Sequence, residues 1–145
     1  NEYGLVVIIT NATYIWVEST LKTLPLTNKV FNDYDIEIIS ARENYMDITN
    51  QMYQWKEYAF RDVVINNLAR HTTQHIISIG DAHYEYDALV NLCNWNTHVH
   101  KILKTVKCMS GPSLNIMMDQ LSCMISTANN IFTNFNFMDI HFELV

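Results

Sequence analysis

Glycine, proline and cysteine are all scarce in this 145-residue chain, which has three, two and three of them. The cysteines Cys93, Cys108 and Cys123 form no C-x-x-C pair, so no disulfide framework and no cysteine-based redox motif is indicated. We expect reduced, mostly buried thiols in a reducing, cytoplasmic compartment. The glycines are widely separated, which excludes a glycine-rich phosphate loop and argues against a Rossmann-type nucleotide binder.

Basic residues and long apolar runs are also lacking. Nine basic residues stand against fifteen acidic ones, for a net charge of −6, and no basic stripe is present, so we expect no nucleic-acid binding. The longest apolar run, Leu5 to Ile9, is too short to span a bilayer, and we expect no membrane association. Because the chain begins with Asn1 rather than Met, we expect it to be the C-terminal part of a longer protein, with no signal peptide.

The composition is that of a folded chain. Hydrophobic residues make up 49% and charged residues 17% of the sequence, which favours a globular core over disorder. The length suits one domain, and neither a linker nor an internal repeat interrupts it. We therefore expect a single core domain over residues 1–145.

Apolar patterns predict alternating strands and helices. Proline and glycine give further signals: Pro25 should end a helix and Pro112 should begin one. Strands that alternate with helices indicate a parallel sheet with helices on both faces, a three-layer Rossmann-like α/β fold. The expected strands are Leu5–Thr10, Ile36–Ser40, His75–Ile79, Val99–Val106 and a half-exposed edge strand Met138–Leu144; the expected helices are Thr13–Leu24, Thr49–Arg70, Glu85–Trp95 and Pro112–Ala128, with a polar loop at Ala41–Asp47.

The stretch His75–Leu89 is the most informative part of the sequence for a functional site. The run from Ile76 to Ile79 predicts a short buried parallel strand. Gly80 follows it, at a turn that should tolerate no Cβ. Asp81 then lies beyond the carboxyl end of the strand, where open α/β sheets bind their ligands. The alternative is that Asp81 only caps the following helix.

Two further polar residues belong to similar positions. Thr10 ends the first strand, which its continuous apolar run predicts to be central and covered on both faces. Lys56 lies near the start of the helix between the second and third strands. A hydroxyl, an ammonium and the Asp81 carboxylate at one rim would bind phosphate oxygens and a hard cation such as Mg²⁺.

The order of these motifs resembles the haloacid dehalogenase-like (HAD) phosphatase superfamily, and more closely a poorly characterised branch of it found in protists and algae. The resemblance covers about Val6 to Ser113. The motifs that carry it are Ile9-Thr-Asn-Ala12, Trp16-Val-Glu18, Ser40-Ala-Arg42, Trp55-Lys56 and Ser78-Ile-Gly-Asp81.

The resemblance implies roles for particular residues. Thr10 would be the phosphate-binding hydroxyl of the second family motif, and Lys56 the lysine of the third, which steadies the phosphoryl group. Asp81 would be the magnesium ligand of the fourth motif. Glu85, four residues on, would be the second acid of that motif, with Asp87 in reserve. The substrate would be a phosphorylated small molecule or a phosphorylated protein partner.

The first family motif, an Asp-x-Asp that supplies the nucleophile, follows no apolar strand in this chain. Asp33-Tyr-Asp35 has the spacing but precedes its strand, so we interpret it as a polar turn. The central strand that carries the motif is also lacking, and we expect it upstream in the intact protein or replaced by another segment. Two functions stay open: a phosphomonoester phosphatase domain, incomplete as given, or a catalytically silent HAD-like structural subunit of a larger assembly.

Two weaker signals remain. His98 with His100, and His71 with His75, have spacings that zinc ligands use, but no third ligand of matching spacing accompanies either pair. A methionine-rich stripe, Met117, Met118 and Met124, indicates either core packing or a surface that faces a partner.

Overall fold

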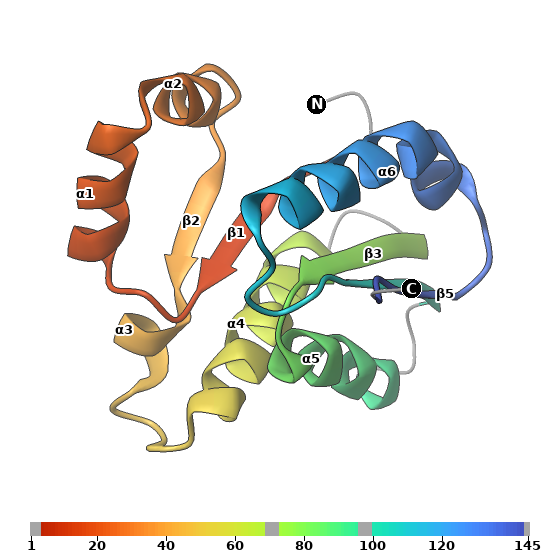
Figure 1. Ribbon diagram of the computed structural model, residues 1–145. Coiled ribbons are helices and arrows are strands. Elements are labelled where there is room, and N and C mark those ends of the chain that lie inside the picture. The colour runs from red at the N-terminus through yellow and green to blue at the C-terminus, as the bar shows by residue number, and fades with distance from the viewer. Residues whose placement is uncertain (1–3, 69–72, 96–99, 144–145) are drawn as a thin grey trace. The chain divides into compact units, whose positions relative to one another are not determined.

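The computed structural model describes residues 4–68, 73–95 and 100–143 and divides into two compact units, Asn1–Val63 and Val64–Val145. Each unit is described by itself (Figure 1). All strand pairs in the described ranges are parallel. The elements in chain order are β1 (Val7–Thr10), α1 (Tyr14–Thr23), α2 (Pro25–Asp33), β2 (Glu37–Ser40), α3 (Ala41–Tyr45), α4 (Met52–Leu68), β3 (Thr73–Gly80), α5 (His83–Asn94), β4 (His100–Lys107), α6 (Leu114–Thr133) and β5 (Met138–His141).

The first unit is built on a two-stranded parallel sheet. β1 and β2 run in register from Val7 opposite Glu37 to Thr10 opposite Ser40, so both strands end at the same edge. Its core is small, and α4 contributes most of it through Trp55, whose indole N–H donates to the Thr49 carbonyl at 2.8 Å. The buried core residues are Ala41, Trp55 and Ala59, with Ile9, Ile39 and Tyr45 packed around them.

The second unit holds a three-stranded parallel sheet in the order β3-β4-β5. The central strand β4 is buried from Lys101 to Val106. Adjacent residues of a strand point to opposite faces, and Ser78, opposite Thr105 in the ladder, donates to the Glu85 carbonyl of α5. Lys104 points to the other face, where its ammonium donates to the Ile131 carbonyl of α6. Helices therefore cover both faces of this sheet (Figure 1).

The α/β class and the parallel pairing are confirmed, but the predicted burial of individual strands is partly wrong. β1 is half-buried throughout rather than covered on both faces. Its described sheet has only two strands, so both are edge strands and neither is central. Ile79 is exposed although a buried strand was expected, since β3 lies at an edge of the described sheet. The edge strand β5 alternates half-buried and exposed residues, as predicted.

Two helices are absent from the sequence-based assignment. Pro25 does follow the end of one helix, but it is also the first residue of α2, a position that suits proline because no intrahelical N–H is needed there. The expected polar loop at Ala41–Asp47 contains the short helix α3. Ser40 caps α3 by accepting from the Glu43 N–H at 3.1 Å, a common way for a serine to begin a helix.

The other long helices lie near their predicted bounds. The turn predicted at Asp33-Tyr-Asp35 is confirmed at Tyr34 and Asp35, with Asp35 at φ +49°, whereas Asp33 is the last residue of α2. Residues 69–70, 99 and 144 of the predicted elements lie outside the described residues. The prediction of mostly buried thiols is wrong, because Cys93 and Cys123 lie on exposed sides of their helices and Cys108 is half-buried. Within residues 4–68, 73–95 and 100–143, none of the helices has the length and apolar character needed to cross a membrane.

Packing of α5 on its sheet should dominate the stability of the second unit. Leu89 is fully buried there, and its neighbour Val90 is exposed. We expect Leu89→Ala to lower the free energy of unfolding by about 2–5 kcal/mol, through lost burial and the cavity left behind. The control Val90→Ala should change it by less than about 0.5 kcal/mol. Urea denaturation of both variants measures the difference, and equal effects would contradict this packing.

Candidate functional site

Two hydroxyl groups hold the turn after β1, and one of them, that of Ser40, comes from the end of β2. The Thr10 hydroxyl accepts from the Ala12 N–H at 3.1 Å and so shapes the turn that follows β1. The buried Ser40 hydroxyl donates to the Ala12 carbonyl at 2.8 Å. These bonds fix where Thr10 lies, at the edge at which parallel sheets place their ligand-binding groups.

Lys56 reaches the same place from α4. Its side chain is 4% exposed, and its ammonium donates to the carbonyl of Ile9, the residue before Thr10. A buried ammonium must be hydrogen-bonded because removing it from water is costly. The structure thus brings together Thr10 and Lys56, two of the sequence-predicted site residues.

Asn11 is the residue at this end of β1 that sequence reasoning missed. Both polar atoms of its amide are buried, and within the described part of the chain neither has a hydrogen-bond partner. A buried amide without partners is rare in native proteins and needs an explanation such as a bound group. The only sequence signal was its place directly after Thr10 in the Ile9–Ala12 motif.

Asp81 lies in the second unit, on a turn that is held by the segment after β4. The Gly80 carbonyl accepts from the Cys108 N–H at 2.7 Å. The Asp81 carbonyl accepts from the Lys107 ammonium and the Ser110 hydroxyl, both at 2.5 Å. The Asp81 side chain itself is exposed. Burial, and after it the negative charge of Asp81, raises the pKa of the Cys108 thiol.

Glu85 serves as a helix cap in this turn. Its carboxylate accepts from the Ala82 N–H at 3.0 Å, and Ala82 is the N-cap residue of α5. The alternative in which Asp81 caps the helix is therefore wrong. Gly80 is needed because a Cβ there would lie 2.8 Å from the Glu85 Cγ. Asp87, further along α5, is exposed.

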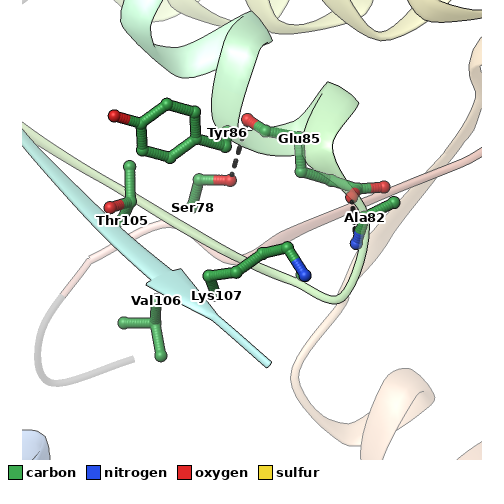
Figure 2. A pocket seen from close by; sticks show the side chains of 8 residues that line it. Ser78, Ala82, Glu85, Tyr86, Thr105, Val106 and Lys107 are labelled. Carbon is green, nitrogen blue, oxygen red and sulfur yellow. Dashed lines mark hydrogen bonds between the residues drawn. The ribbon is translucent and has the colours of Figure 1, made fainter. Parts of the chain in front are cut away.

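An open hollow of about 170 Å³ lies between the start of α5 and strands β3 and β4. Figure 2 shows the Lys107 side chain extending toward the turn that carries Ala82, while the Ser78 hydroxyl points to the Glu85 carbonyl. Much of this volume is open to solvent, so the hollow does not enclose a substrate-sized molecule. It is lined by Ser78, Gly80, Ala82, Glu85, Tyr86, Thr105, Val106 and Lys107.

A magnesium ion is the cofactor that the resemblance implies. Mg²⁺ is commonly held by one or two carboxylates together with phosphate oxygens and water. The exposed Asp81 carboxylate at a strand end fits that need, whereas the Glu85 carboxylate is engaged with Ala82. No cluster of three or more His, Cys, Asp or Glu side chains suited to a metal occurs in the ranges that the structure covers. Of the zinc candidates, His71 and His98 lie outside those ranges.

The buried ammonium of Lys104 lies on the other face of the second sheet. Lys104 is fully buried, and burial lowers its pKa. Its Nζ lies 3.4 Å from the His75 Nδ1. Burial, and next the Lys104 charge, lowers the pKa of His75 below its usual 6.5, and the Phe135 ring packs edge-on against the imidazole.

At the sheet edge, β5 is joined to β4 by side chains. The Thr105 hydroxyl and the His141 ring both contact the Asp139 carboxylate, His141 at 2.8 Å. The Thr105 hydrogen bond is the main cause that lowers the pKa of Asp139, and His141 lowers it further. The hydroxyl bonds to the carboxylate rather than to the imidazole, so this group lacks the order of a nucleophilic triad.

Gly80→Ala should destabilise the second unit by about 1–3 kcal/mol, because the new methyl group overlaps the Glu85 side chain and disturbs its cap. Glu85→Ala should cost about 0.5–2 kcal/mol through the lost cap. The double variant should cost less than the sum of the two, since one side chain is involved in both. Urea denaturation of the four proteins tests this, and strict additivity would contradict the contact.

The stability of the second unit should fall on mild acidification. His75 has a lower pKa when folded than when unfolded, so the unfolded chain takes up its proton first and the free energy of unfolding decreases as the pH falls below about 6.5. His75→Gln should flatten this decrease between about pH 7 and pH 5. The exposed His83, changed to Gln, is the matched control and should leave it unchanged. Thermal denaturation across this pH range gives the measurement.

No family model, curated protein or solved structure matches this chain in comparisons with each. Its function must therefore be inferred from the residues at the end of β1 and from those on the Asp81 turn.

Proposed function

We propose that this chain is the phosphate-binding and metal-binding part of a HAD-like phosphomonoester phosphatase. The observation that supports the proposal best is the carboxyl end of β1. A hydroxyl (Thr10), a buried ammonium (Lys56) and an amide without partners (Asn11) gather there. These are the donor types that bind phosphoryl oxygens, and their low exposure strengthens each interaction.

The reaction would move a phosphoryl group twice. The ester P–O bond breaks as an aspartate carboxylate from an upstream Asp-x-Asp motif takes up the phosphoryl group, while the second aspartate of that motif protonates the leaving alcohol. Water then hydrolyses the acyl phosphate to inorganic phosphate and the free carboxylate. Thr10 and Lys56 would donate to the phosphoryl oxygens and stabilise the charge on them during both steps. Because the Thr10 turn is held by Ala12, its hydroxyl would need little rearrangement on binding.

Asp81 would hold the magnesium ion. When bound, Mg²⁺ would offset the negative charge of the phosphoryl oxygens. The carbonyl of Asp81 is held by Lys107 and Ser110, so the main chain that carries the carboxylate is already fixed. Glu85 would contribute indirectly, through its cap at Ala82, and Asp87 remains the reserve ligand.

A catalytically silent structural subunit is the second candidate. No Asp-x-Asp follows an apolar strand in the sequence, and large apolar side chains are exposed in both units. In a structural subunit, apolar side chains of this kind would contact other proteins. Examples are Ile15, Trp16 and Leu26 in the first unit and Ile125 and Phe135 in the second.

The test is magnesium-dependent hydrolysis of a generic aryl phosphate by the longest natural form of the protein. Asp81→Asn should lower kcat/KM by about 100-fold or more, because it removes the carboxylate proposed to hold the magnesium ion. Asp119→Asn, which changes an exposed acid on α6, is the matched control and should leave the activity unchanged. Circular dichroism establishes that each variant is folded.

One result would contradict the phosphatase, and another would contradict only the metal role of Asp81. One is a folded, full-length protein without phosphatase activity, which would leave the silent subunit. The other is activity that survives Asp81→Asn at the wild-type level, which would exclude Asp81 as the metal ligand.

A further inference from the structure

Helix α6 carries an apolar stripe that the second unit leaves uncovered. Its exposure ranges from 44% at Leu121 to 77% at Ile125. The residues recur at steps of three and four, so they share one face of the helix. The α6 stripe consists of Leu114, Met117, Met118, Leu121 and Ile125.

α6 is already docked on its sheet through a different side. Gln120 and Ile131 are buried there. The Gln120 side chain accepts from the Met109 N–H at 2.9 Å, and the Ile131 carbonyl accepts from Lys104. The stripe is therefore additional apolar surface beyond what this packing uses.

The spacing of the stripe makes it self-complementary. Leu114, Met118, Leu121 and Ile125 follow steps of four, three and four, which is the seam of a two-helix coiled coil. In an antiparallel pair about a two-fold axis between positions 119 and 120, Leu114 faces Ile125 of the other copy, and Met118 faces Leu121. A two-fold interface requires such matching of one surface with itself.

The charge distribution of α6 does not oppose pairing with a second copy. Asp119 is the sole charged residue of α6, and it lies away from the stripe by helical spacing. The remaining polar residues of the helix are neutral. Two copies, each with a net charge of −6, can thus meet along this helix without bringing like charges into contact.

We propose that the α6 stripe is the interface of an antiparallel homodimer. A single helix seam offers less than the roughly 800 Å² per partner of a standard stable interface. The dimer is accordingly weak and forms over micromolar concentrations. This inference does not depend on the phosphatase proposal.

Sedimentation analysis of the whole chain over a concentration series tests the proposal. The wild-type mass should rise from that of one 16.9 kDa chain toward twice that value. Leu121→Glu and Met118→Lys should each weaken the dimer at least tenfold, since each buries an unpaired charge. An equimolar mixture of the two variants should dimerise again, because the new carboxylate of one copy faces the new ammonium of the other.

Recovery in the mixture is specific to the antiparallel register, since a parallel pair would place Met118 against Met118. Ile15→Glu, at an exposed apolar position of α1, is the matched control and should leave the dimer intact. Circular dichroism checks folding, and the facing pair Leu114→Lys and Ile125→Glu replaces the first pair if either of its variants fails to fold. A wild-type chain that stays monomeric, a dimer that survives the α6 variants, or a mixture that does not recover would each overturn the proposal.

Discussion

Parallel strand pairing is the constraint on which the rest of each unit depends. Parallel neighbours cannot be joined by a tight turn, so every connection crosses back through a helix. The carboxyl ends of paired strands then meet at one edge, as Thr10 and Ser40 do in the first unit and Gly80 and Lys107 do in the second. Polar groups collect at these edges because the main chain leaves the sheet there and must find new hydrogen-bond partners.

The candidate site residues have structural roles as well as possible chemical ones. Lys56 joins α4 to β1 through the Ile9 carbonyl, and Lys107 joins the end of β4 to the Asp81 turn. Each ammonium is held by main-chain carbonyl groups, so both charges have fixed positions before any ligand binds. Such preorganisation is what electrostatic recognition of an anion requires.

Both units leave apolar side chains exposed. The first unit has a small core around Trp55 and Ala59, and much of the apolar content of its helices remains exposed. In the second unit, α6 uses one side on its sheet and leaves a continuous stripe on another. A phosphatase and a subunit that pairs with other chains use different residues of this molecule: the first uses the strand ends, and the second uses the α6 stripe.

The sequence by itself determined the α/β class, the order of the main elements and the alternating edge strand, because these follow from local hydrophobic period and from proline and glycine. It also suggested Thr10 and Lys56 as site residues, and in the structure the Lys56 ammonium donates to the carbonyl of the residue before Thr10. Tertiary structure alone decided that β4 is the buried central strand, that Glu85 caps α5, and that the Asn11 amide is buried without a partner. Each of these features depends on contacts between residues distant in the sequence or on the space left between packed elements. Such contacts and spaces cannot be read from a short stretch of residues.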